Sequence, residues 1–420
     1  MTKSDFNKNI AITIIFVVCI FLLWKFGIIY SHSLFPIVKE GRLHIFADWA
    51  WVIKNGICKN LGFDIFKSYD ACPLFGKDNF IFNIGNILLY IPYFKFLEKF
   101  YFFYFPLMLC SIFIYTIIKL IDRKNFLNIA LLILIVFSPQ VLLVLERCNV
   151  DLIIFLFLII MVKINQPFLS FSIINFVTLL KYYPAALITN FVVERKRSLN
   201  KNIFIILIFF STLACLMYLS GESFELIRYK LNAVSATWGN QFSLHSFAIL
   251  LSKFKKHDFN TILIITLSIF IILSFSFYKY FQSTLENIEL DENNFKYRLY
   301  IVGSNLIIAV YLITHNIHYR EIFLIALFPL ILELKDNKKI IFFKYFVLFI
   351  IFRLIIFYFT NYYVFFKKIY SLLYIKAFLD IIMMSIFFGL TLFFNLKLIK
   401  NYLVTDQKKK INDIKFYKFK

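Results

Sequence analysis

Long apolar runs recur along the whole chain, and short polar or charged segments separate them. A hydrocarbon core of about 30 Å takes about 20 residues of helix to cross, and runs that approach or reach this length include 10–23, 126–145, 203–219, 261–277 and 340–360. These runs are continuously apolar, whereas the strands of a membrane barrel alternate in segments of about ten residues. Since only helices and closed barrels satisfy their backbone polar groups in lipid, the pattern predicts an all-α polytopic membrane protein.

Charges at the ends of the runs predict the orientation of the chain. Residues 194–197 are Glu-Arg-Lys-Arg, and residues 401–420 are rich in lysine. Positive residues favour the cytoplasmic side, so both termini are expected inside, with the first run as an uncleaved first span. This gives about twelve spans in a single membrane domain over 1–400, followed by a basic cytoplasmic tail over 401–420.

Two longer segments without a clear span fall on the outer face in this topology. The first, 32–98, should hold interfacial helices, and the second is 220–258. Polar residues at 146–151 and 315–320 reach the same face. Because an ionisable residue in the membrane is costly unless it is paired or hydrated, these clusters are candidate functional sites.

Composition supports the membrane interpretation and argues against other classes. Of the 420 residues, 61% are apolar and only 17% are charged, whereas ordinary soluble domains have about 25% charged residues. The net charge of +22 would suggest nucleic acid in a soluble chain, but the positive residues gather at span ends and in the tail, where they fit topology and anionic lipid. Membrane lipids are therefore expected partners and nucleic acid is not. Without metal-ligand spacing, a Walker loop or a dinucleotide turn, no metal or nucleotide site is expected.

Cysteines in the first outer loop predict a disulfide. Cys58 and Cys72 both lie there, in a compartment where disulfides persist. A bridge would close a short loop and stabilise it by about 3 kcal/mol on a chain-entropy estimate. Cys148 lies at the same membrane face and could compete as a partner.

Several polar stretches follow one another in a characteristic order: Asp48-Trp49-Ala50-Trp51 leading to Gly62-Phe63-Asp64, Arg147-Cys148-Asn149-Val150-Asp151, Lys181-Tyr182-Tyr183-Pro184, Gly239-Asn240-Gln241-Phe242-Ser243, and the turn His315 to Tyr319. Over residues 40–330 this order resembles the GT-C membrane glycosyltransferases of glycosyltransferase family 87, the polyprenol-phosphate-mannose-dependent mannosyltransferase type. The chain departs from that family at Cys148, where Gly is usual, and at Phe242, which separates Gln241 from Ser243.

The resemblance implies a GT-C-like bundle and a hexosyltransferase. Such an enzyme moves a sugar, with inversion, from a polyprenyl-phosphate donor to a glycan or glycolipid acceptor at the outer face of a bacterial inner membrane. The reaction needs a carboxylate to take the acceptor proton and cations to hold the leaving phosphate. The lipid-linked sugar is a substrate, so no separate cofactor is expected.

Candidate site residues follow from this chemistry. Asp48 is the predicted general base, with Asp64 or Asp151 as alternatives. The predicted ligands of the donor phosphate are Arg147, His318, Arg320 and Lys181. The predicted sugar or acceptor contacts are Trp238, Asn240, Gln241, Asn149 and Asp151.

Structural roles for the same residues stay open. Asp48 can cap a loop or form a structural ion pair, and Arg147 can be an interfacial anchor. Asp151 can cap the next helix or interact with its dipole. Lys181 can tie together the two short apolar helices expected at 168–180 and 185–193, on either side of Pro184. Trp238 can be a membrane-interface anchor.

Two other functions are compatible with the pattern. A transporter or flippase for lipid-linked glycans is expected to show internal repeats and polar residues throughout the membrane depth, whereas no repeat is evident and the polar clusters gather on one face. A glycan ligase or polymerase that uses the same lipid carrier is separated from a glycosyltransferase only weakly by sequence.

Overall fold

The computed structural model describes residues 3–25, 45–63, 65, 72, 74, 84–164, 166–189, 199–221, 225, 242–255, 258–286, 288, 294–313, 318–336, 340–367 and 371–417. This part of the chain is helical and holds no strand. The first half contains α1 (Lys3–Lys25), α3 (Ala47–Asn60), η2 (Asn86–Tyr90), η3 (Lys95–Leu97), η4 (Phe100–Tyr104), α4 (Phe105–Leu120), α5 (Phe126–Val136), α6 (Pro139–Arg147), α7 (Asp151–Ile164), α8 (Pro167–Leu180) and η5 (Tyr183–Leu187). The second half contains α10 (Leu199–Leu219), α12 (Leu244–Lys255), α13 (Phe259–Leu285), α14 (Phe295–Ile313), η6 (His318–Leu327), α15 (Phe328–Asp336), α16 (Ile341–Lys367) and α17 (Ser371–Tyr417).

Several helices are long and apolar enough to cross a membrane, as expected for a helical membrane protein. Among the described residues there are five such candidates: Asp5–Leu22, Phe100–Leu120, Phe259–Leu285, Ile341–Phe359 and Leu372–Lys400. A sixth arises if α5 and α6, which are bent by 43° relative to each other, form one span. The prediction of about twelve spans is not confirmed by these helices.

The bend between α5 and α6 has a local cause. Proline cannot continue a helix without losing a hydrogen bond, and Pro139 is the first residue of α6. Ser138 begins the new helix as its cap, because its hydroxyl accepts a hydrogen bond from the amide of Val141 at 3.4 Å. The predicted run 126–145 is therefore two shorter helices that meet at an angle.

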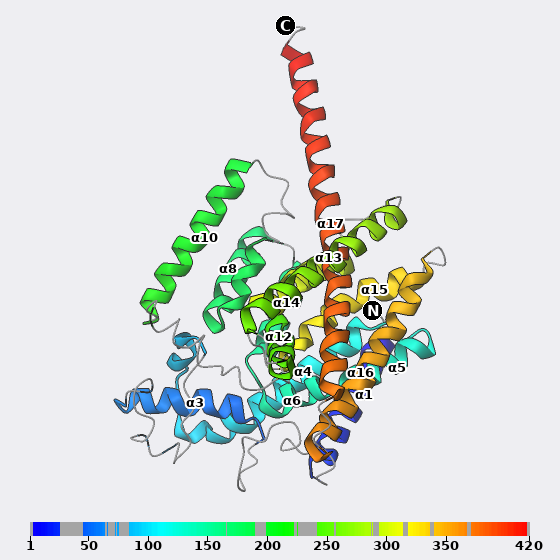
Figure 1. The fold of residues 1–420 in the computed structure, drawn as a ribbon. Helices are drawn as coiled ribbons and strands as arrows, with labels where there is room; N and C mark the ends of the chain where they lie inside the picture. The colour runs from blue at the N-terminus through cyan, green and yellow to red at the C-terminus, as the bar shows by residue number, and fades with distance from the viewer. Residues whose placement is uncertain are drawn as a thin grey trace.

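The two ends of the molecule differ in character. Figure 1 shows α3 lying crosswise at one end, whereas α17, in orange to red, runs through the bundle and projects beyond the opposite end. α3 lies within the predicted outer loop 32–98, and α12 lies within the predicted second loop 220–258. α3 and the basic C-terminal segment thus lie at opposite ends of the molecule.

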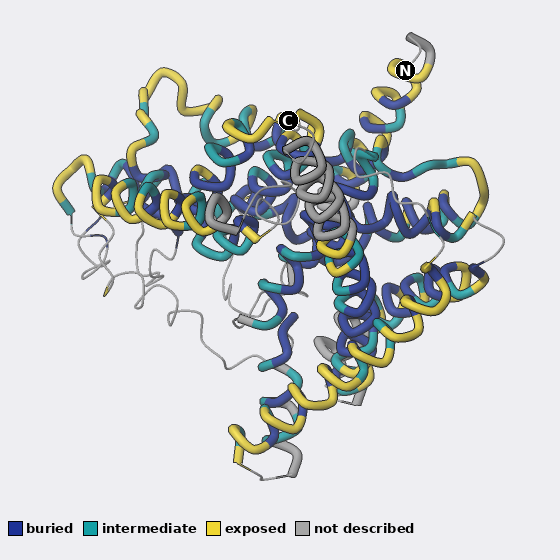
Figure 2. Tube along the Cα trace, turned by 90° about the horizontal axis from the view of Figure 1, so that it is seen from above, coloured by how far each residue is buried: buried dark blue, intermediate teal, exposed yellow. Residues whose placement is uncertain are grey.

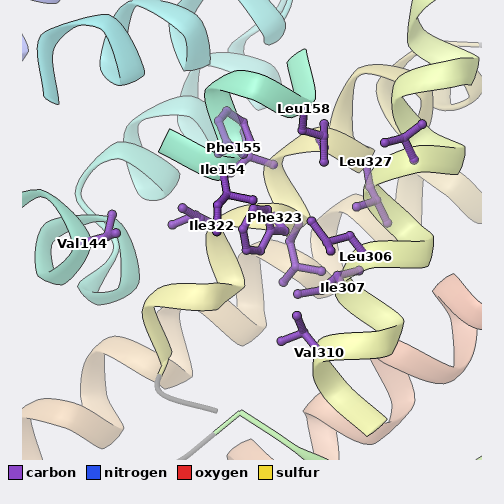
Figure 3. Packing of buried hydrophobic residues seen from close by; sticks show 14 of the residues in the cluster. Val144, Ile154, Phe155, Leu158, Leu306, Ile307, Val310, Ile322, Phe323 and Leu327 are labelled. Carbon is purple, nitrogen blue, oxygen red and sulfur yellow. The ribbon is translucent and has the colours of Figure 1, made fainter. Parts of the chain in front are cut away.

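The centre of the bundle is built around η6. In Figure 3, Ile322, Phe323 and Leu327 of η6 lie among buried side chains of α7 and α14, which include Ile154, Phe155, Leu158, Leu306, Ile307 and Val310. The rings of Phe155 and Phe323 are 6.4 Å apart. The apolar residues 322–332 thus belong to two short elements, the end of this 3₁₀ helix and the start of α15.

Burial follows the pattern expected of a bundle in lipid. Figure 2 shows buried segments at the centre and exposed ones along the perimeter. Large apolar side chains are exposed on the outer helices, such as Phe204 on α10 and Ile272 on α13. Such contiguous apolar surface suits contact with lipid.

The predicted disulfide is confirmed. Cys58, near the end of α3, is bonded to Cys72, and their Cα atoms are 6.0 Å apart. Cys148 does not compete for this bond. It is a buried free thiol whose Sγ lies 3.8 Å from the carbonyl oxygen of Pro106.

Candidate functional site

The first turn of α3 carries Asp48 to the end of α6. The amide of Phe46, just before α3, donates to the carbonyl oxygen of Glu146 in α6. The indole of Trp49 donates to the carbonyl oxygen of Tyr101 at 3.0 Å. These two bonds fix the start of α3, and an acidic residue in a first turn is also favoured by the helix dipole.

Both oxygens of the Asp48 carboxylate are held by side chains at the end of α6 and just after it. Arg147 Nη1 lies 2.9 Å from Oδ1, and Asn149 Nδ2 donates to Oδ2 at 2.5 Å. The side chain of Asp48 is 18% exposed and that of Arg147 is 25% exposed. The pair is thus partly open to a ligand, whereas the network behind it is buried.

The backbone at this junction is unusual. Phe46 (φ 66°) and Cys148 (φ 44°) are the non-glycine residues with positive φ in the described part of the chain, and each lies one or two residues from the Asp48–Arg147 pair. Positive φ is the conformation that glycine adopts freely at a helix C-terminus, which explains why a glycine would suit position 148. Such backbone outliers concentrate at functional sites.

Asn149 joins the partly exposed Asp48–Arg147 pair to the buried network around Asp151. Its Oδ1 accepts from the amide of Asp151 at 3.0 Å and from Lys181 Nζ at 2.8 Å. With Nδ2 on Asp48, all the polar atoms of this amide are engaged. Asn149 therefore caps α7, whereas Asp151 lies in its first turn, where the helix dipole favours a negative charge.

Asp151 is the centre of the buried part. Its side chain is fully buried, and its Oδ1 lies 2.8 Å from Lys181 Nζ and accepts from the hydroxyl of Tyr183 at 2.7 Å. Arg320 Nε lies 3.8 Å from Oδ2, and the guanidinium stands over the Tyr183 ring at 4.9 Å. These contacts join the start of α7 to η5 and η6.

Lys181 has the structural role that its position beside a proline suggests. It lies in extended conformation where α8 ends, directly before η5, and it binds both Asn149 and Asp151. Burial lowers the pKa of its ammonium group, and the adjacent Asp151 carboxylate acts in the opposite direction. Lys181 thus ties the junction between α8 and η5 to α7.

The structure brings together Asp48, Arg147, Asn149, Asp151, Lys181 and Arg320, which are all predicted site residues. The predicted residues Trp238, Asn240 and Gln241, and the alternative base Asp64, lie outside the described residues. His318 begins η6, but its side chain also lies outside them.

Sequence reasoning missed two sets of residues. Tyr183 belongs to the Lys-Tyr-Tyr-Pro stretch, and only the fold shows that its hydroxyl reaches Asp151. A second buried ionic cluster joins η6 to α16 and α17 and consists of Glu321, Arg353, Asp380 and Lys376. The signal for this cluster was present, because Arg353 stands alone in a long apolar run and Lys376 and Asp380 are an opposite-charge pair, four positions apart, in another.

The site contains three cations and two carboxylates, with Arg147 and Arg320 as the more exposed cations. Such a set can bind an anion and accept a proton. Within the described residues, no group of three or more His, Cys, Asp or Glu is placed to hold a metal ion. Comparison of the chain with protein-family models, with curated proteins and with solved structures finds no match.

Proposed function

We propose that this protein is an inverting GT-C-type glycosyltransferase that moves a hexose from a polyprenyl-phosphate donor to a glycan or glycolipid acceptor. The observation that carries the proposal is the partly exposed Asp48 carboxylate held by Arg147 and Asn149, with Arg320 and Lys181 in the adjoining network. The complete enzyme would have about twelve spans, both termini in the cytoplasm and the site at the outer face of a bacterial inner membrane.

In this proposal Asp48 takes the proton from the acceptor hydroxyl. An ionised carboxylate offers about four acceptor positions, and the two contacts from Arg147 and Asn149 leave room for a third hydrogen bond. A carboxylate held by fixed donors is already oriented when the acceptor arrives, which is the advantage of a preorganised site.

The arginines would receive the leaving phosphate. Arg147 and Arg320 are 25% and 15% exposed, so a lipid phosphate can reach them, whereas Lys181 is only 8% exposed and is occupied by Asp151. Arginine binds phosphate through paired hydrogen bonds, and such cations stabilise the growing negative charge on a leaving group. Trp238, Asn240 and Gln241 remain the predicted sugar contacts.

The decisive experiment offers the purified, full-length protein two radiolabelled donors with a glycan acceptor. One is polyprenyl-phosphate mannose, and the other is a polyprenyl-pyrophosphate oligosaccharide. Transfer from the first supports the proposal. Transfer from the second alone would indicate a ligase or polymerase, and movement of the labelled lipid across vesicles without transfer would indicate a flippase.

Asp48→Asn is expected to lower transfer by about 10²- to 10⁴-fold, because the amide keeps the size of the side chain but cannot accept the proton. Direct binding of radiolabelled polyprenyl phosphate should persist. Asp122→Asn is the matched control, because Asp122 is an exposed carboxylate in a surface pair with Lys124. An Asp48→Asn protein as active as the control would remove Asp48 from the reaction.

A further inference from the structure

The second ionic cluster adjoins the candidate site, because its member Glu321 follows Arg320 in the chain. Arg320 and Glu321 are neighbours in η6, yet they contact different parts of the protein. Arg320 faces Asp151 and Tyr183, whereas Glu321 is buried at 3% exposure and its Oε2 lies 2.6 Å from Arg353 Nη2. The first turn of η6 is thus held from two directions.

The cluster is balanced in charge and buried, and all of its members except Glu321 lie in candidate spans. Arg353 of α16 is 1% exposed, and its Nε also donates to Asp380 Oδ1 at 2.6 Å. Lys376, one turn before Asp380 on α17, lies 3.1 Å from Asp380 Oδ2. Two carboxylates and two cations therefore satisfy one another where an unpaired charge would be costly.

Glu321 also binds the helix that carries the other arginine. Gln140 Nε2, at the start of α6, donates to the same Oε2 of Glu321 at 3.0 Å. α6 is nine residues long and ends at Arg147. One carboxylate oxygen thus connects the helix of Arg147 with the helix of Arg320.

Polar bonds add to the packing of η6 at this junction. η6 is a 3₁₀ helix of ten residues, whereas 3₁₀ runs longer than about four residues are uncommon because their hydrogen-bond geometry is poorer. The polar side chains of Gln140, Glu321 and Arg353 border a pocket of about 30 Å³. The rest of this lining is mostly apolar, with Val141, Ile322 and Leu354 among its side chains, so the polar bonds of Glu321 lie at the edge of an apolar pocket.

We infer that Glu321, held by Arg353, is a positioning residue that sets the places of Arg320 and, through Gln140, of Arg147. This inference rests on the proposed function for the role of the two arginines as phosphate ligands. The anchoring itself is a property of the fold and can be measured without substrate.

Glu321→Gln and Asp380→Asn form a matched pair for the test. Each removes one negative charge from Arg353, but only Glu321 belongs to η6 and contacts Gln140. In the full-length protein in lipid nanodiscs, Glu321→Gln is expected to speed amide hydrogen exchange in 318–327 and 139–147 by about 10- to 100-fold, since hydrogen bonds to charged groups are the strong ones. Asp380→Asn should leave these two segments protected. Equal exchange in both variants would overturn the anchor.

Kinetics with polyprenyl-phosphate mannose test the consequence for the site. Glu321→Gln should raise the donor KM by about 10- to 100-fold, because small displacements of binding groups are costly, while Asp380→Asn should leave it unchanged. Replacing both partners, as in Glu321→Gln with Arg353→Gln, leaves Asp380 and Lys376 as a neutral pair and should recover part of the loss.

Amide hydrogen exchange and the donor KM together show whether the anchor, the positioning role or the proposed function fails. An unchanged KM in Glu321→Gln overturns the positioning role even if exchange is faster. If the unsubstituted protein transfers no sugar from the phosphate donor, the proposed function fails, and the exchange contrast alone then confirms or overturns the anchor.

Discussion

Asp48 and Asp151 are two carboxylates in one network with different environments. Asp48 is 18% exposed and bound by Arg147 and Asn149, whereas Asp151 is fully buried and bound by Lys181. A partly exposed carboxylate can exchange a contact for a substrate hydroxyl. A buried one that loses its partner keeps an uncompensated charge. The environment therefore supports the proposed role of Asp48 as the base and gives Asp151 a structural role.

Breaking the buried pair should destabilise the protein strongly. Asp151→Asn or Lys181→Met is expected to cost about 3–5 kcal/mol, because the first leaves Lys181 buried without its nearest carboxylate and the second leaves Asp151 with the more distant Arg320 as its cationic partner. Asp151→Asn combined with Lys181→Gln should cost less than either single change. The measurement is the free energy of unfolding in detergent.

The exposed Lys124–Asp122 pair, whose side chains are 79% and 40% exposed, provides the control. Lys124→Met should leave the free energy of unfolding almost unchanged, because exposed ion pairs contribute little to stability. If Lys181→Met behaves like Lys124→Met, the Asp151–Lys181 pair does not hold the site together.

At the scale of elements, helix ends place the site. α6 ends at Arg147, α7 begins at Asp151, and α8 ends just before Lys181. The segment before η2 docks on the end of α8, where the amide of Gly85 donates to the carbonyl oxygen of Leu180 at 3.0 Å. Breaks in the helices thus bring polar groups together that continuous spans would keep apart.

Gly85→Ala should disturb this docking. A Cβ at position 85 would overlap the backbone carbonyl of Leu179, so η2 or the end of α8 must shift. We expect a loss of about 1–3 kcal/mol in unfolding free energy and a drop in transfer, because Lys181 follows directly.

Gly62→Ala is the comparison, since a Cβ there meets open space although φ is +86°. It should cost stability without lowering transfer. Equal transfer by both variants would contradict the importance of the Gly85 contact for the site.

The Cys58–Cys72 disulfide gives a second prediction at this scale, for the stability of α3. Non-reduced peptide mapping should find Cys58 joined to Cys72, and replacing both by Ser should destabilise the α3 region by about 3 kcal/mol. Cys148 should react with maleimide only after denaturation, because it is buried. A Cys148 peptide in the bond, or free Cys58 and Cys72 thiols, would contradict the pairing.

At the scale of the whole molecule, α3 with Asp48 and the basic end of α17 lie at opposite ends, as Figure 1 shows. Lysines concentrate in 397–420, and positive residues favour the cytoplasmic side. The arrangement agrees with a site on the outer face and a tail inside.

Reporter fusions test this orientation. Alkaline phosphatase fused after residue 420 should be inactive, and a fluorescent protein at the same place should be bright, because the tail is expected in the cytoplasm. Phosphatase fused within the segment between α1 and α3 should be active. The reverse pattern would place Asp48 on the cytoplasmic side and exclude a donor site at the outer face.

The sequence by itself determined the helical membrane class, the disulfide partners and most of the side chains that meet at the site. These depend on local properties, namely the length of an apolar run, a break at a proline, or an ionisable residue at the end of a run. Arg147 and Lys181 stood out for this reason, whereas the site roles of Asp48 and Asn149 were implied by the resemblance to a known family.

Only the tertiary structure decided how those side chains pair. Asn149 rather than Asp151 caps α7, Tyr183 reaches Asp151, and Glu321 meets both Arg353 and Gln140, which is 181 positions away. A buried charge needs a partner, but which partner it finds depends on which helices are neighbours. Which helices are neighbours depends on packing around η6 between residues far apart in the sequence. A local sequence pattern does not encode it.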